Sequence, residues 1–130
     1  MIVVDASAAI ELALMSRVGR AVMQRVDGRS LHAPELLLVE VAQVLRRLTA
    51  GGDVSARRAE QALEDLLDLD VALYEHEALV RRAWQLRSNL TAYDAVYVAL
   101  AEGLDAPLLT TDARLTSAPG NRARLELATG

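Results

Sequence analysis

Residues 91–112, TAYDAVYVALAEGLDAPLLTTD, decide the fold that this sequence predicts. The stretch begins as a helix, because Thr91 can cap a first turn and most of the residues that follow are apolar. Gly103 is expected to end this helix. The apolar run 106–109 then has the length of a buried strand, and Asp112 follows it closely. A helix followed by a buried strand predicts an α/β fold, in which ligands bind beyond the carboxyl ends of the strands.

Short apolar runs and helical patterns alternate along the rest of the chain as well. The run 2–4 contains no polar residue and ends at Asp5, which predicts a strand covered on both faces, as in a parallel sheet. Further strands are predicted at 31–32, 70–74 and 125–128, the last of them at an edge. Helices are predicted over 5–12, 17–26, 34–50, 53–67, 76–87, 91–103 and 113–116. The alternation predicts a parallel sheet packed between helices.

The predicted helix over 34–50 carries an acid beside its apolar face. Pro34 suits the first turn of a helix, because its missing N–H costs nothing there. Glu40 falls in the second turn, too deep to serve as a cap, and lies next to an apolar stripe. The stripe consists of Leu37, Val41, Val44, Leu45 and Leu48. An ionised carboxylate beside the core is costly unless it is paired or binds a cation, so the alternative is a rim glutamate paired with an arginine.

Composition narrows the class of protein. We expect residues 1–130 to form one domain with a core of Leu, Val and Ala, since aromatic residues make up only 3% of the chain. The absence of cysteine excludes disulfides, thiolate metal sites and a cysteine nucleophile. The sequence shows neither a signal peptide nor a run of membrane-spanning length, so we expect a cytoplasmic protein without membrane contact. The net charge is −4, and every permanently basic residue is an arginine because the chain contains no lysine.

Three further acids occupy positions where a structural role would be ordinary. Asp5 and Asp112 each precede a predicted helix and can cap it, and Asp94 stands where the acid of a capping box would. Together with Glu40 they indicate a site, because the carboxyl ends of parallel strands meet at one edge of a sheet. Four acids at one edge repel one another unless a cation lies between them. A set of ligands made only of oxygen atoms favours Mg²⁺ or Mn²⁺ over zinc.

Hydroxyl side chains lie beside these acids. Ser7 and Thr110 can orient a carboxylate or a metal-bound water, although a local backbone hydrogen bond is the alternative for each. The two histidines have no partner at metal-binding spacing and are not expected to be ligands. Tyr93 and Tyr97 recur at helical spacing and are assigned to packing.

Three segments together resemble the PIN-domain family, most closely the VapC toxins of bacterial toxin–antitoxin pairs. The segments are MIVVDASAAIEL (1–12), PELLLVEVAQVLRR (34–47) and TAYDAVYVALAEGLDAPLLTTDARL (91–115). They stand in the family's order and at its usual separations, and they cover the start, middle and end of the chain. The resemblance implies a three-layer α/β/α fold with a short parallel sheet flanked by helices.

The resemblance also implies an activity and assigns roles to residues. It makes Asp5, Glu40 and Asp94 the primary ligands of Mg²⁺ or Mn²⁺ and Asp112 a fourth acid. The implied activity is that of an endoribonuclease in which a metal-activated water attacks an RNA phosphodiester. The implied partners are a VapB-type antitoxin, which holds the toxin inactive, and a second copy in a homodimer.

Since an acidic pocket cannot hold RNA by itself, arginines at its rim are needed for binding. The candidates are Arg17, Arg20, Arg46, Arg47, Arg87 and Arg114. Ser7 and Thr110 match small hydroxyl residues that support the acids in the family.

Two other functions are compatible with the acids. An Asp-dependent phosphohydrolase or a receiver domain would use Asp5 as a phosphoryl acceptor, but both classes use a lysine nearby and this chain has none. The phosphohydrolase also needs an acid where Ser7 stands. A non-catalytic PIN-like binding module would keep the fold for partner contact alone. Binding of a divalent cation distinguishes a nuclease from such a module.

Overall fold

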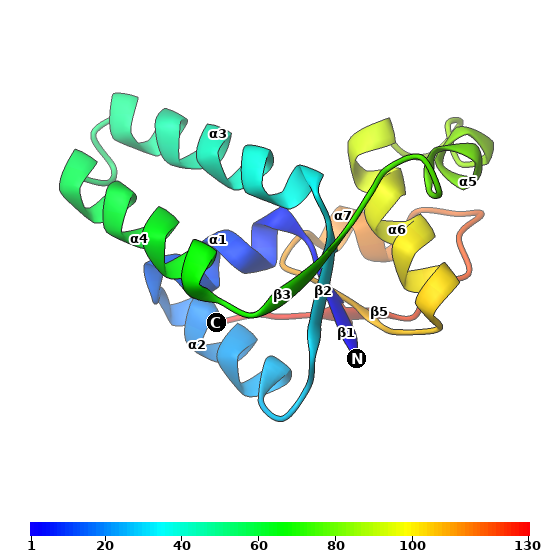
Figure 1. The fold of residues 1–130 in the computed structure, drawn as a ribbon, viewed down its shortest axis with the longest axis horizontal. Helices are drawn as coiled ribbons and strands as arrows, with labels where there is room; N and C mark the ends of the chain where they lie inside the picture. The colour runs from blue at the N-terminus through cyan, green and yellow to red at the C-terminus, as the bar shows by residue number, and fades with distance from the viewer.

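Five strands form one sheet between two layers of helices (Figure 1). The computed structural model describes all residues, 1–130. Across the sheet the strands are β3 (Val71–Tyr74), β2 (Leu31–Pro34), β1 (Ile2–Val4), β4 (Leu108–Thr110) and β5 (Leu125–Leu127). Every neighbouring pair is parallel. The predicted parallel sheet, with the last strand at its edge, is confirmed.

Helices cover both faces of the sheet. They are α1 (Ala6–Leu14), α2 (Arg17–Val26), α3 (Leu36–Ala50), α4 (Ala56–Asp68), α5 (Val80–Gln85), α6 (Ala92–Leu104) and α7 (Ala113–Thr116). In Figure 1, α1 to α4 lie on one side of the sheet and α5 to α7 on the other, which confirms the three-layer α/β/α fold. No helix combines the length and the apolar character needed to cross a bilayer.

The order of the strands creates a crevice between β1 and β4. The first three strands run from the centre of the sheet to one edge, and β4 then pairs with the other side of β1, where Val4 lies opposite Leu109. Strands whose connections leave in opposite directions form a topological switch point, which is where α/β proteins bind ligands. Asp5 directly follows β1, and Asp112 lies just beyond β4.

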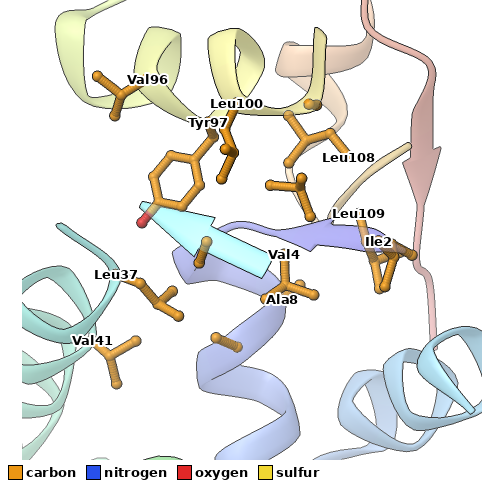
Figure 2. Close-up of a cluster of buried hydrophobic side chains, with 14 of the residues drawn as sticks. Ile2, Val4, Ala8, Leu37, Val41, Val96, Tyr97, Leu100, Leu108 and Leu109 are labelled. Atoms are coloured by element: carbon orange, nitrogen blue, oxygen red, sulfur yellow. The ribbon is translucent and has the colours of Figure 1, made fainter. Parts of the chain in front are cut away.

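The core is aliphatic, as the composition predicted. Figure 2 shows Val4 and Leu109 from neighbouring strands packed between side chains of helices on both faces. The middle of α6, from Ala95 to Ala101, is buried on every side, and its alanines let the helix lie close to the sheet. Tyr97 is the only aromatic side chain in this core, and its hydroxyl points out of the apolar cluster in Figure 2.

The prediction that a helix starts at Pro34 is wrong. Pro34 is the last residue of β2, and α3 begins at Leu36. The reason is the pairing of β2 with β3, since Pro34 lies opposite Tyr74 and the N–H of Glu35 donates to the Tyr74 carbonyl at 2.9 Å. The imidazole of His76 caps α3, because its Nε2 accepts from the N–H of Leu36 at 3.0 Å.

Two further helix boundaries differ from the prediction. The segment predicted as helical over 76–87 starts with a turn, and α5 spans only Val80–Gln85. The contact of the His76 ring with the start of α3 holds that turn away from the helix axis. Gly103 does not end α6, which runs on to a left-handed cap at Asp105 with a φ of 50°. Aspartate is one of the few non-glycine residues that adopt this conformation readily.

Candidate active site

Four carboxylates gather at the crevice between β1 and β4, and their charges influence one another. Burial raises the pKa of Asp5, and the charge of Asp94 raises it further. Burial also raises the pKa of Glu40, to which the charges of Asp94 and Asp5 add. The pKa of Asp94 is raised by burial and then by the charge of Asp112. The acids predicted to form one site therefore share one electrostatic environment.

Asp5 is the most deeply buried of the four acids, with 7% of its surface exposed. Its Oδ1 caps α1, accepting from the N–H of Ala8 at 2.9 Å and from the hydroxyl of Ser7 at 2.6 Å. The side chain of Thr110 is a further hydrogen-bond partner that lowers the pKa of Asp5 against the effect of burial. Asp5 thus fulfils the ordinary capping role at the end of β1.

Ser7 and Thr110 connect the ends of β1 and β4. The Ser7 hydroxyl lies 3.2 Å from that of Thr110 and accepts from the N–H of Thr111 at 3.0 Å. The Thr110 hydroxyl, which is fully buried, accepts from the N–H of Asp112 at 3.0 Å. The two hydroxyls therefore tie the carboxylate of Asp5 to the backbone that carries Asp112.

A tyrosine from α6 holds Glu40. The Tyr97 hydroxyl donates to Glu40 Oε1 at 2.6 Å, while Oε2 accepts no hydrogen bond from the protein. Burial and the contact with Glu40 raise the pKa of Tyr97 well above its usual value, so the hydroxyl remains a donor. Tyr97 packs in the core, as predicted, and its hydroxyl adds a contact with Glu40 that the sequence did not predict. The sequence spacing indicated that Tyr97 lies near the acids, because it follows Asp94 by one helical turn and shares its face of the helix.

Asp112 differs from the other three acids. Its Oδ1 accepts from the backbone N–H of Arg114 at 3.0 Å and from Nε of the same residue at 3.1 Å, and its Oδ2 accepts from Nη2 at 2.9 Å. These contacts hold the pKa of Asp112 below its usual range. The Arg114 side chain is 91% exposed, and an ion pair so open to water is weak. The guanidinium of Arg114 thus pairs with Asp112, in an ion pair that can break.

Two hollows open beside the acids. One has a volume of about 240 Å³ and is lined by Asp94, Asp112 and Arg114, among others. The second has a volume of about 480 Å³, lies along α3 and is lined by Glu40 and Arg47, among others. Arg114 and Arg47 therefore lie next to the acids.

The other candidate arginines lie farther from the acids. Arg87 follows α5 and comes just before Asn89, which lines the smaller hollow. Arg46 lines a separate hollow between α3 and α4. Arg17 and Arg20 lie on α2 and line neither of the hollows beside the acids.

The donor atoms suit a hard divalent cation. All four candidate ligands are carboxylates, and the imidazoles of His32 and His76 are engaged elsewhere in hydrogen bonds. Glu40 keeps one oxygen, Oε2, that accepts no hydrogen bond from the protein. No three acidic or imidazole side chains lie close enough together to enclose an ion.

The fold and the acidic crevice together define a known class. The PIN domain model matches residues 2–121, and the chain belongs to the PIN-domain family. It is 42% identical over 127 residues to ribonuclease VapC12 of Mycobacterium tuberculosis, and the match covers 98% of each chain. Ribonuclease VapC1 of the same organism is 41% identical to it, with 96% of each chain covered. The resemblance to VapC proteins is thereby confirmed.

A solved structure shows the same fold. The chain is similar to a chain of VapBC2 from Rickettsia felis, solved bound to a DNA fragment from their promoter, with a TM-score of 0.69. The match covers 99% of this chain and 100% of that one at 13% sequence identity. At that level of identity the likeness speaks for the fold alone.

Proposed function

We propose that this protein is a VapC-type toxin, an endoribonuclease that depends on Mg²⁺ or Mn²⁺. The observation that carries the proposal is the placement of Asp5 at the end of β1, within the electrostatic reach of Glu40 and Asp94, with Oε2 of Glu40 free of hydrogen bonds. The ribonuclease names of VapC12 and VapC1 support RNA as the substrate. One continuous hydrophobic core supports treating residues 1–130 as a single PIN-like domain. An RNA substrate implies a cytoplasmic site of action.

Each acid has a part in this proposal. Asp5, Glu40 and Asp94 would hold the metal, and Asp112 would join them once Arg114 releases it. The bound ion would supply an activated water and neutralise charge on the scissile phosphate. Burial of Asp5 keeps bulk water from that carboxylate, which strengthens its attraction to a cation.

Supporting residues fix the acids in place. Ser7 and Thr110 join the two strand ends, so Asp5 and Asp112 keep their separation. Tyr97 occupies one oxygen of Glu40 and leaves the other for the metal. Such partners of metal ligands orient the carboxylates and are usually worth 10- to 100-fold in affinity or activity.

Arginines would hold the RNA backbone beside this acidic site. Arg114 and Arg47 line the two hollows and are the best-placed candidates for phosphate contacts. Arg17, Arg20 and Arg46 lie outside these hollows, and their part in RNA binding stays a prediction.

Cleavage of RNA by the purified protein tests the proposal. Total cellular RNA is incubated with wild-type protein in Mg²⁺, in Mn²⁺ and with a chelator, beside Asp94→Asn. Asp105→Asn is the matched control, because Asp105 is an exposed acid at the opposite end of α6. We expect metal-dependent cleavage by wild type and by the control but not by Asp94→Asn. Absence of both cleavage and Mn²⁺ binding would leave a non-catalytic binding module as the better description.

A VapB-type antitoxin and a second copy of the chain are the proposed protein partners. The VapC names of the two Mycobacterium relatives support the first, because VapC toxins are paired with VapB-type antitoxins in the family that the sequence resembles. Val39 and Tyr93 are exposed apolar side chains beside the larger hollow and offer a contact surface. Light scattering of the purified protein, alone and co-expressed with the antitoxin encoded next to it, would give the mass of each assembly. A monomer that captures no antitoxin would contradict both partners.

A further inference from the structure

An exposed pair of an aromatic ring and a cation lies at α5 and has no part in the proposed metal chemistry. Trp84 is the only tryptophan of the chain, and it is 68% exposed on α5. The guanidinium carbon of Arg87 lies 4.6 Å from the centroid of its ring. Nη1 of Arg87 also donates to the Trp84 carbonyl at 3.0 Å. The cation is therefore held against the ring by two contacts.

The helix that carries this pair is fixed to the rest of the protein. Its inner face is buried through Ala83, with Leu79 and Leu86 just outside its two ends. On its flank, Arg82 Nε donates to Glu102 Oε2 at 2.7 Å, a contact with α6. A rigid support of this kind presents Trp84 in one position, so little ordering is needed when a ligand binds.

The backbone connects this pair to the hollow beside the acids. Arg87 is two residues from Asn89, and two extended residues span at most about 7 Å. Asn89 lines the same hollow as Asp94 and Asp112. The backbone at Arg87 is therefore near the rim of this hollow, and its side chain turns from there toward Trp84.

We propose that Trp84 and Arg87 form a stacking platform for an unpaired nucleobase of the RNA strand that leaves this hollow. This inference rests on the proposed ribonuclease function and assigns a substrate-binding role to two residues outside the acids. Every base has a π-face that stacks on an aromatic ring, and arginine adds attraction to the neighbouring phosphate. Bases inside a duplex have both faces covered, so they cannot use the platform.

The surroundings of the platform favour RNA over a protein partner. Arg81, Gln85 and Ser88 are exposed polar residues around Trp84, and Val80 is the only other exposed large apolar residue of α5. Protein interfaces have a more continuous apolar centre than this. A ring with adjoining guanidinium groups matches a polymer that is both aromatic and anionic.

Fluorescence of the lone tryptophan tests the proposal directly. The Asp94→Asn variant of the full chain, which should not cleave, is titrated with oligouridine and, separately, with an RNA duplex of equal length. We expect oligouridine to quench the emission of Trp84 in a saturable way and the duplex to quench it far less. Equal quenching by both RNAs, or none by either, would overturn the inference.

Substitutions in the same Asp94→Asn background identify the contact. Trp84→Leu keeps an apolar side chain and should weaken oligouridine binding about 5- to 100-fold, with Trp84→Phe in between. Val80→Ala, on the same face of α5, should bind like its parent. Unchanged RNA binding by Trp84→Leu would overturn the platform. An equal loss of RNA binding in Val80→Ala, together with a change in oligomeric mass, would also overturn it and would indicate a contact between protein chains.

The two proposals fail in different ways. If wild type cleaves RNA and Trp84→Leu alone in the wild-type background cleaves it with the same KM, only the platform is wrong. If no metal supports cleavage yet oligouridine still quenches Trp84, the nuclease is wrong and the platform is supported as an RNA-binding site.

Discussion

Tyr97 and Glu40, 57 residues apart in the chain, meet through a hydrogen bond of 2.6 Å. Tyr97→Phe removes the donor and keeps the ring that fills the core. This hydrogen bond lowers the pKa of Glu40, so its loss should raise that pKa and weaken metal binding. We expect Mn²⁺ affinity to fall roughly tenfold by calorimetry, and stability in urea to fall by about 1 kcal/mol. Tyr93→Phe, at an exposed position on the same helix, is the control. Wild-type Mn²⁺ affinity in Tyr97→Phe would show that Tyr97 only packs.

Repulsion among the acids should destabilise the metal-free protein. Burial and the charge of Asp112 raise the folded-state pKa of Asp94 above its unfolded value of 3.8. Between these two pKa values the folded state binds more protons than the unfolded state, so the contribution of Asp94 to stability falls as the pH rises through this window.

Asp94→Asn removes this repulsion. In the presence of a chelator the variant should be more stable than wild type at neutral pH by roughly 0.5–1 kcal/mol, a modest value because water still screens this half-buried group. The difference should vanish below about pH 3, where the carboxyl is protonated in both states. Saturating Mn²⁺ should reverse the order, because it stabilises only the protein that binds it. Urea denaturation across pH measures all three effects, and a variant less stable than wild type at neutral pH would refute the argument.

Ser7→Ala should loosen the junction between β1 and β4. The change removes a donor to Asp5 and an acceptor for the N–H of Thr111. A partly buried N–H left without a partner costs about 1–3 kcal/mol, and we expect a loss of about 2 kcal/mol in urea denaturation. Ser88→Ala, at an exposed position outside any helix or strand, should change stability by less than about 0.5 kcal/mol. Comparable stability of the two variants would mean that the hydroxyl network contributes little.

Arg114→Ala should have opposite effects on the metal and on RNA. Without the guanidinium, Asp112 loses its internal cation, so Mn²⁺ should bind several-fold more tightly in calorimetry. RNA should bind less tightly, and the slope of log affinity against log salt should fall by about 1 if Arg114 contacts one phosphate. Arg122→Ala is the control at another exposed arginine. A decrease in both affinities would mean that Arg114 supports the fold of the site.

The sequence predicted what depends on local pattern. Unbroken apolar runs identified the buried strands, and the acids at strand and helix ends followed from their positions relative to those runs. The contacts that complete the site join distant parts of the chain, and no local pattern encodes them. Tyr97 contacts Glu40 only because α6 and α3 pack on opposite faces of the same sheet, near its carboxyl edge. Pro34 was misassigned for the same reason, since its place in β2 depends on pairing with β3, far along the chain.

The complete burial of the middle of α6 has a genetic consequence. If the protein is toxic to its host, survivors selected for loss of toxicity will carry many substitutions between Ala95 and Ala101, since this part of the helix has no solvent-facing side on which changes would be neutral. A bulky residue at the buried Ala99 would push the helix away from its neighbours and move Asp94 relative to Asp5. Such variants would lose activity as if a residue of the site had been changed, although the substituted residue does not contact the substrate.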